Sequence, residues 1–296
     1  MGAAALCSAQ MKPTPFQYHA PKTIAETLDL LAQHGPDDGR VLAGGQSLVP
    51  TMAFRLARPK HLVDINGVAG LDRLVVENGR LCIGAGVRHS AFEKPVEDGP
   101  LGRLLALVVR HIAHHPIRAR GTFCGSIAHA DPASEWCAVA AALDAEIVAE
   151  SKVGGTRTIP VKSFFEGIMT TALHESELLR EVRLPILPKG TYVGFAEYSR
   201  RAGDYGVAMA VTTYRLRNGV MSDLHVGIGG AEAIPRRMAE AERMLIGRAP
   251  NLGTFQAAAH EARKAVDPLD DPSISADYRR GVVRTMVIRA LENATT

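Results

Sequence analysis

Two short segments that carry glycine beside a hydroxyl residue, 43–47 and 122–126, constrain the fold of this chain more than any other feature. Glycine has no Cβ, so its backbone can approach an anion closely, and consecutive N–H groups in such a turn form an anion-binding nest. Either segment alone predicts only a turn. Because about 75 residues separate them, they cannot form one G-x-G-x-x-G fingerprint. We expect them to converge on one extended ligand, such as a dinucleotide, between two subdomains.

The first segment lies between two short apolar runs. Residues 41–43 predict a strand that stops at Gly44 and Gly45, residues 48–56 predict a helix-like piece, and residues 61–65 predict a second strand. This strand–turn–helix–strand order is shorter than a standard dinucleotide-binding crossover. The turn contains no lysine, which excludes the Walker arrangement of a phosphate loop.

The second segment follows two arginines, Arg118 and Arg120. The hydroxyls of Thr122 and Ser126, together with backbone amides, can satisfy the oxygens of a pyrophosphate. Two adjacent cations would overcompensate its charge, so we expect at least one arginine to form an ion pair elsewhere in the protein. The predicted helix that follows begins near residue 134, and its N-terminus favours negative charge.

Apolar periodicity and turn residues predict the remaining elements. Pro185 and Pro188 interrupt the chain where the sequence pattern changes, and we place a domain boundary near residue 185. Beyond it the chain is α+β, with three antiparallel strands followed by helices that cover one face of the sheet. We expect helices at 23–34, 101–115, 134–145, 231–246, 252–265 and 275–290, a hairpin at 74–76 and 81–84, and strands at 146–150, 193–198, 207–216 and 224–228.

Composition narrows the class of protein. The net charge is only +3, with 34 basic and 31 acidic residues, so no strong field favours nucleic acid. The four cysteines form no C-x-x-C pair, which argues against an iron–sulfur cluster on this chain and favours a reducing, cytoplasmic location. No apolar run of about 18 residues predicts a membrane span. Residues 1–10 lack the pattern of a signal peptide, and we expect residues 1–11 to be a flexible extension.

Several motifs together resemble one family. Residues 43–50 (AGGQSLVP), 55–59 (RLARP) and 62–65 (LVDI) look like the FAD-binding medium subunit of molybdenum hydroxylases, the carbon monoxide dehydrogenase and xanthine dehydrogenase family. Residues 117–122 and 128–132 resemble that family's second flavin motif, and residues 200–205 (RRAGDY) and 229–237 resemble its C-terminal signatures. The resemblance covers about residues 12 to 290.

The resemblance implies a fold, a cofactor and partners. The fold would be α+β, with an FAD-binding domain of the vanillyl-alcohol-oxidase (PCMH) type at 12–185, divided into α/β subdomains at 12–66 and 67–185. A C-terminal α+β domain with a three-stranded antiparallel sheet would occupy 186–296. FAD would accept electrons from the [2Fe–2S] clusters of a small subunit and pass them to an external acceptor. A large molybdopterin subunit would hydroxylate the substrate, and the three subunits would form a heterohexamer, (LMS)2.

The resemblance also implies the FAD-binding residues, and it implies no catalytic residue and no metal ligand on this chain. Glu135 would accept hydrogen bonds from a sugar hydroxyl, Asp131 would contact the flavin or only cap a helix, and Tyr205 would shield the ring or only pack. The first loop would contribute Leu42, Ala43, Gly44, Gly45, Gln46, Ser47, Leu48 and Val49, the second Gly121, Thr122, Cys124, Gly125 and Ser126, and the flavin ring would contact Ile112, Ala113 and Leu179.

Cys124 and Ala119 depart from the family pattern, which usually has glycine and asparagine at these positions. Cys124 keeps its backbone N–H, so anion binding can survive. If the position needs a positive φ, however, the cysteine would be strained by about 1 kcal/mol or more. The thiol is either reactive beside cations or simply a small packed side chain, and we favour the packed side chain.

Three histidines, His111, His114 and His115, lie at the end of the predicted helix 101–115. His111 and His115 are spaced i, i+4, as two zinc ligands could be, but no H-E-x-x-H glutamate intervenes. A helix C-terminus also attracts imidazolium, so we favour structural or capping roles.

Three functions remain open at this point. The chain is an electron-transfer flavoprotein subunit, a stand-alone FAD-dependent reductase of the same flavin fold, or an interaction subunit that has lost its flavin. The visible spectrum of the purified chain separates the third from the others, and co-purification of a molybdenum subunit favours the first over the second.

Overall fold

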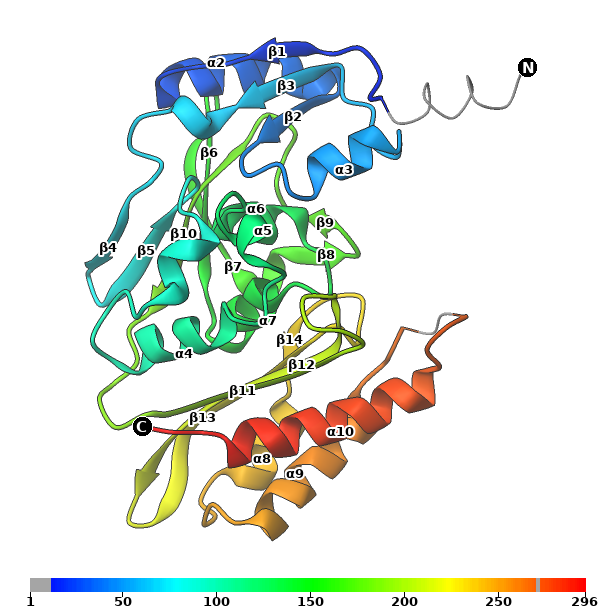
Figure 1. Ribbon diagram of the computed structural model, residues 1–296. Coiled ribbons are helices and arrows are strands. Elements are labelled where there is room, and N and C mark those ends of the chain that lie inside the picture. The colour runs from blue at the N-terminus through cyan, green and yellow to red at the C-terminus, as the bar shows by residue number, and fades with distance from the viewer. Residues whose placement is uncertain (1–11, 270–271) are drawn as a thin grey trace.

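The computed structural model describes residues 12–269 and 272–296, and its elements form an N-terminal lobe, a central sheet with helices, and a C-terminal sheet with helices (Figure 1). The extension predicted at residues 1–11 lies outside the described residues. No helix within the described ranges is both long enough and apolar enough to cross a membrane.

The N-terminal lobe contains the predicted strand–turn–helix–strand unit. Strands β2 (Gly39–Leu42) and β3 (His61–Asp64) are parallel, and α3 (Leu48–Ala53) connects them. A strand that the sequence analysis did not predict, β1 (Gln17–His19), pairs with the other edge of β3. Helix α2 (Ile24–His34), which the sequence predicted at 23–34, packs on β3, and the side chain of its N-cap Thr23 accepts a hydrogen bond from the Glu26 N–H.

The central sheet has five strands in the order β4-β5-β10-β6-β7, all antiparallel. The predicted hairpin forms β4 (Leu74–Glu77) and β5 (Arg80–Gly84). The middle strand, β10 (Leu178–Pro185), comes from a segment about 100 residues further along the chain. Its sequence alternates charged and apolar residues around Glu181 and Val182, and the apolar ones enter the core beneath α6 and α7.

The C-terminal sheet has the three predicted antiparallel strands, β11 (Tyr192–Ser199), β12 (Gly206–Arg217) and β13 (Val220–Gly229), and a two-residue strand at its edge, β14 (Arg236–Arg237). As expected, its own helices α8, α9 and α10 cover one face (Figure 1). The opposite face packs against α4 and α7 of the preceding region. A Cβ on Gly227 would lie 2.5 Å from the Cβ of Ala142 in α7, so the sheet and this helix are in close contact.

Three sequence predictions were wrong in their boundaries. The helix expected at 101–115 ends at Val108, and Ala113 has a positive φ of 41° that no α-helix tolerates. The helix expected at 231–246 covers only 239–245, because residues 236–237 pair with β13 instead. Residues 122–126 form the start of a helix rather than a turn.

The remaining elements complete this frame, and the two-stranded sheet of β8 and β9 lies beside α6 in Figure 1. The helices are α4 (Pro100–Val108), α5 (His115–Arg118), α6 (Phe123–His129), α7 (Glu135–Ala142), α8 (Ala239–Leu245), α9 (Leu252–Ala265) and α10 (Ala276–Glu292), and the strands are β6 (Glu146–Ser151), β7 (Gly155–Pro160), β8 (Phe165–Gly167) and β9 (Thr170–Thr171).

Candidate functional site

The two glycine segments lie against each other. The first is the loop from the end of β2 to the start of α3, and the second runs from Gly121 into α6. A Cβ built on Gly44 would lie 2.4 Å from the Arg120 carbonyl oxygen and 2.5 Å from the Gly121 Cα. A Cβ on Gly125 would lie 3.9 Å from the Ala43 Cβ. The expectation that segments far apart in the sequence converge is therefore confirmed.

The first loop presents backbone donors that nothing in the described chain uses. No recorded hydrogen bond within the described residues engages the N–H groups of Gly44, Gly45, Gln46 or Ser47. Gly45 has a φ of +71°, a left-handed conformation that glycine adopts without strain. Successive N–H groups in such a turn point into one concavity and form a nest for an anion.

The second segment is a capped helix start. The Thr122 side chain accepts a hydrogen bond of 3.0 Å from the Gly125 N–H, which makes Thr122 the N-cap of α6. Because its oxygen serves as the acceptor, the hydroxyl proton stays available for a ligand oxygen. Cys124, Gly125 and Ser126 all lie within α6.

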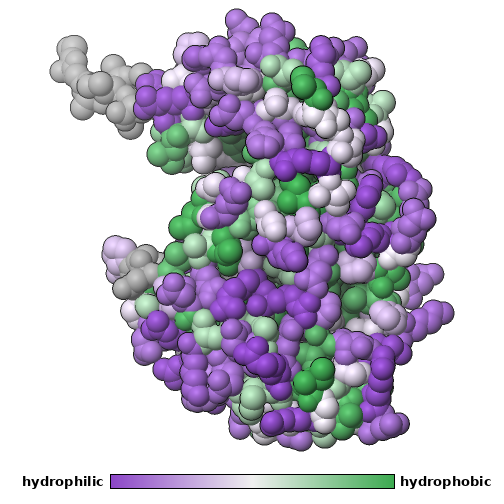
Figure 2. All heavy atoms as spheres, turned by 180° about the vertical axis from the view of Figure 1, so that it is seen from behind, coloured by the Kyte–Doolittle hydropathy of each residue, from purple (hydrophilic) through white to green (hydrophobic). Residues whose placement is uncertain are grey.

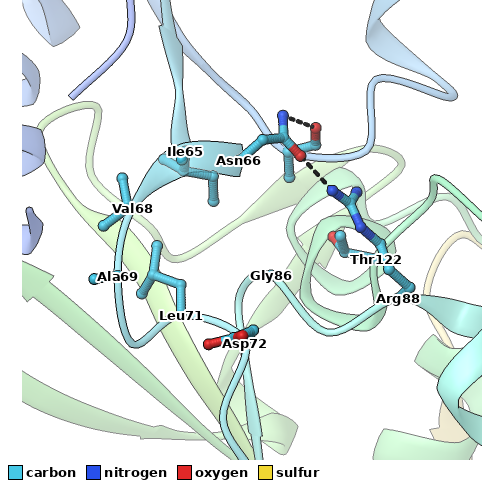
Figure 3. Close-up of a pocket in the computed structure, with 11 residues that line it drawn as sticks. Ile65, Asn66, Val68, Ala69, Leu71, Asp72, Gly86, Arg88 and Thr122 are labelled. Atoms are coloured by element: carbon cyan, nitrogen blue, oxygen red, sulfur yellow. Dashed lines mark hydrogen bonds between the residues drawn. The ribbon is translucent and has the colours of Figure 1, made fainter. Parts of the chain in front are cut away.

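Arg88 and Asn66 join the two segments, and the sequence analysis missed both (Figure 3). The Asn66 side-chain amide donates to the Ala43 carbonyl at 2.8 Å, and Arg88 donates to the Asn66 Oδ1 at 2.5 Å. A second Arg88 nitrogen donates to the carbonyl of Arg120. These hydrogen bonds link the carbonyl just before the first glycine turn to the carbonyl just before Gly121. No sequence signal marked these residues, because the contacts span 22 and 32 residues.

A pocket of about 340 Å³ opens beside this bridge. Ala43 and Thr122 contribute one residue from each glycine segment to its wall, and Arg88 and Asn66 line it as well (Figure 3). The side opposite Arg88 combines the apolar residues Ile65, Val68 and Leu71 with the carboxylate of Asp72 (Figure 3). The remaining lining residues are Gly67, Ala69 and Gly86.

The buried side chain of His89 packs against the second segment at Gly121. His89 accepts a hydrogen bond of 2.9 Å at Nδ1 from the indole N–H of Trp136, and burial lowers the pKa of His89 to about 4. The ring is therefore neutral at pH 7, with its proton on Nε2. A Cβ on Gly121 would lie 2.6 Å from this nitrogen, so Gly121 has no room for a side chain. Trp136 is fully buried in the core.

The two arginines have different roles, as expected. Arg118 pairs with Glu93 at 2.9 Å and donates to the carbonyls of Ile112 and Ala113 at 3.1 and 3.0 Å. It therefore fixes the turn that carries these two predicted ring contacts. Arg120 has no recorded ion pair in the part of the chain that the structure describes.

Asp131 and Glu135 follow α6 in the chain, and the charges of both act on Tyr205 of the C-terminal domain. Glu135 begins α7 and is 9% exposed, and burial followed by the charge of Asp131 raises its pKa to about 7. Asp131 accepts a hydrogen bond from the Ala133 N–H, which is a capping role. The Tyr205 side chain lies near Ser47, and desolvation followed by the charges of Asp131 and Glu135 raises the pKa of Tyr205. The C-terminal domain thus brings this side chain close to the first loop.

A second pocket, of about 600 Å³, lies next to Asp131 and Tyr205. Its wall combines residues 131–133, residues 168–169 and residues 203–207. A hollow in the surface also separates the N-terminal lobe from the rest of the molecule (Figure 2). Leu179, a predicted ring contact, is buried in β10 and pairs with Ala149.

Cys124 is not strained. It lies in α6 without a positive φ, so the possibility of backbone strain at this position is wrong. Its thiol is 2% exposed and donates to the Ile83 carbonyl at 3.2 Å. Burial strongly raises the pKa of the Cys124 thiol, which keeps it protonated and unreactive. The favoured interpretation, a small packed thiol, is confirmed.

The histidines 111, 114 and 115 do not share a helix face, because α4 ends before them. His111 packs edge-on against Phe195 with ring centroids 4.9 Å apart, and burial lowers its pKa. His114 is the N-cap residue of α5, and His115 lies 3.4 Å from Glu93. The expectation that these histidines lie at the end of the helix is therefore wrong, and His111 and His115 do not share a helix face.

Comparison with known proteins identifies the class that this fold and these loops define. Residues 14–187 match the family described as the FAD binding domain in molybdopterin dehydrogenase. Residues 194–294 match the family described as the CO dehydrogenase flavoprotein C-terminal domain. The chain belongs to the family of FAD-binding medium subunits of molybdenum hydroxylases, and its cofactor is FAD.

Individual relatives and solved structures match over almost the whole length. Subunit alpha of the 6-hydroxypseudooxynicotine dehydrogenase complex of Paenarthrobacter nicotinovorans is 39% identical over 285 residues, covering 96% of each chain. The chain superposes on carbon monoxide dehydrogenase from Hydrogenophaga pseudoflava with a TM-score of 0.90 at 36% identity, covering 96% of this chain and 98% of the other. For quinoline 2-oxidoreductase from Pseudomonas putida 86 the TM-score is 0.88 at 32% identity, with coverages of 95% and 97%. The resemblance to a flavoprotein component of oxidoreductases is thus confirmed.

Proposed function

We propose that this chain is the electron-transfer subunit of a molybdenum-containing hydroxylase. Its FAD accepts electrons from [2Fe–2S] clusters of a small partner subunit and passes them to an external acceptor. A large molybdopterin subunit carries out the hydroxylation, and the assembly is a cytoplasmic (LMS)2 heterohexamer. The relatives named as medium chains or subunits of dehydrogenase complexes support an assembly, and they weigh against a stand-alone reductase.

The observation that carries this proposal is the contact between Gly44 and the backbone of Arg120 and Gly121. The unused N–H groups of the first loop and the Thr122 hydroxyl belong to the two segments that meet at this contact, which supports a shared ligand. Backbone donors and a hydroxyl from two sides fit the two phosphates of a dinucleotide. When bound, FAD supplies the redox chemistry, and this chain's residues bind it, orient it and exclude water.

The structure supports a division of roles among the predicted residues. Leu42 to Val49 would hold the pyrophosphate and ribitol from one side, and Gly121, Thr122, Cys124, Gly125 and Ser126 from the other. The pocket beside Asn66 and Arg88, with its apolar side chains, would take the part of the dinucleotide beyond the phosphates.

The ring end of FAD would lie toward the second pocket. Ile112, Ala113 and Leu179 would contact it, Glu135 would accept from a sugar hydroxyl, and Asp131 would keep its capping role. Tyr205, which reaches Ser47 from the C-terminal domain, would shield the ring. We keep 12–66, 67–185 and 186–296 as the proposed division of the chain. Residue 185 is the last of β10.

The decisive experiment uses the complex purified with its partner subunits and the variant Gly45→Val. A side chain at the φ of +71° is strained, and its atoms would approach Leu42 and Val49, where a Cβ already lies 3.2 Å from each side chain. We expect the variant complex to lose FAD. Substrate should still reduce the iron–sulfur clusters, measured by electron paramagnetic resonance, while electron delivery to the acceptor stops. Stoichiometric FAD in the variant would refute the loop assignment, and cluster reduction with unchanged acceptor turnover would refute the electron path.

A further inference from the structure

Three histidines from separate elements meet on the N-terminal lobe, away from both glycine segments. His19 lies on β1, His34 ends α2, and His61 begins β3. Each offers one ring nitrogen, and these three atoms all lie within 4.8 Å of one another. No sequence motif predicts this cluster, because the three residues are 15 to 42 positions apart.

The rings are stacked rather than dispersed. Ring centroids are 4.0 Å apart for His34 and His61, and 4.7 Å apart for His19 and His34. Three imidazoles this close cannot all be protonated without strong repulsion. The neutral imidazole is the form that binds a metal ion.

The closest pair of nitrogens already has the spacing of two metal ligands. His19 Nε2 and His61 Nδ1 are 3.2 Å apart. Two nitrogens bound to one zinc ion at about 2.05 Å and at a tetrahedral angle would be roughly 3.3 Å apart. The His34 nitrogen lies within 4.8 Å of the other two, and the ring must turn out of its stack with His61 to complete a third bond. The helix C-terminus at which His34 lies favours a cation.

Asp37 places a carboxylate near the second ring nitrogen of His61, as metal-binding histidines usually have. His61 Nε2, the nitrogen that faces away from His19, is 3.6 Å from the Asp37 Oδ2. A carboxylate there orients the ring with Nδ1 toward the metal and makes that nitrogen more basic. Lys60 pairs with the same carboxylate.

We propose that His19, His34 and His61 form a binding site for one divalent transition-metal ion of the zinc class. Three imidazole nitrogens with a fourth position open to water suit zinc, and also cobalt and nickel. Because the ligands come from β1, α2 and β3, the bound ion fastens these three elements together. This site is independent of FAD and of the electron path.

The test uses the full chain, freed of any affinity tag and of metal with a chelator, then titrated with ZnCl2 at neutral pH. We expect one zinc ion per chain by calorimetry, a rise in melting temperature, and visible absorption bands of tetrahedral cobalt when CoCl2 replaces zinc. His34→Ala and His19→Gln should both lose stoichiometric binding. Asp37→Asn should bind about tenfold more weakly, since it loses only the outer carboxylate.

The matched control is His260→Ala, because His260 is an exposed histidine outside the cluster. It should bind zinc as the unaltered chain does. Circular dichroism and FAD content should be equal in all variants, which separates loss of the metal site from loss of the fold or of flavin binding. The proposal is overturned if the unaltered chain takes up no stoichiometric zinc, or if His34→Ala and His19→Gln bind zinc with the same affinity as the control.

Discussion

The backbone of Gly44 lies against the carbonyl group of Arg120, 76 positions along the chain, so closely that a Cβ on Gly44 would be 2.4 Å from that oxygen. This contact holds one glycine segment against the other, and neither partner can move away without opening the proposed FAD site. The glycine at this position therefore serves tertiary packing as well as a turn.

Gly44→Ala is expected to separate the two segments and weaken FAD binding by more than about tenfold, which corresponds to about 1.4 kcal/mol. Flavin absorbance per chain after gel filtration, and fluorescence titration with FAD, measure the loss. Gly281→Ala is the matched control, since a Cβ there meets no atom within 4 Å. Equal FAD affinity in the two variants would show that the close contact is irrelevant to binding.

Replacing Arg88 with methionine should weaken the contact between the two glycine segments, because Arg88 links them by hydrogen bonds. The substitution leaves the Asn66 Oδ1 and the Arg120 carbonyl without their donor, which costs about 1–3 kcal/mol. Urea unfolding should report this loss, and FAD should dissociate faster. Arg217→Met removes only an exposed pair with Asp223, worth about 0–1 kcal/mol, and is the control. Similar midpoints for both variants would contradict a bridging role for Arg88.

Glu197 makes the stability of the chain depend on pH. Its Oε2 is buried without a hydrogen-bond partner, and burial, followed by the charge of Glu135, raises its pKa to about 8. A raised pKa means that the folded state favours the protonated carboxyl. Its contribution to stability is therefore fully present below the ordinary pKa of about 4.5 and is lost as the pH rises through about 8.

Glu197→Gln should remove this dependence, because glutamine imitates the protonated acid at every pH. At pH 9 we expect the variant to be more stable by about 1–3 kcal/mol, and each kcal/mol raises the melting temperature by roughly 2–4 °C. At pH 5 the two proteins should melt alike. Differential scanning calorimetry at both pH values measures the effect, with Glu166→Gln as an exposed control. A difference in melting temperature that is the same at both pH values would contradict a raised pKa of Glu197.

Cys124→Gly, which restores the glycine usual in the family, should destabilise the chain. The substitution removes a buried side chain from α6 and adds backbone freedom to the helix, at a cost of about 1–3 kcal/mol. FAD content should be unchanged, because position 124 would contact FAD only through its backbone N–H, which glycine also has. A gain in stability measured by urea unfolding would mean that the cysteine is strained after all.

The elements that the sequence predicted well depend on local patterns. Thr23 caps α2, and residues 252–265 form α9 with the predicted bounds, because capping and helical periodicity act within a few residues. One wrong boundary arose where a distant partner overrides local preference, because residues 236–237 pair with β13. The predicted helix 101–115 stops at Val108, although its amphipathic pattern continues to Ile112, and Arg118 holds the turn that follows through the carbonyls of residues 112 and 113.

The sequence by itself determined that two glycine segments exist, what family they resemble and which residues in them carry donors. Only the tertiary structure decided how they meet. A side chain at Gly44 would collide with the Arg120 carbonyl, and a side chain at Gly121 would collide with the His89 ring. Arg88 and Asn66 join the segments, and His19, His34 and His61 form a cluster, through contacts between residues far apart in the chain. Periodicity and spacing report only neighbours along the chain, whereas these contacts depend on how the sheets and helices pack.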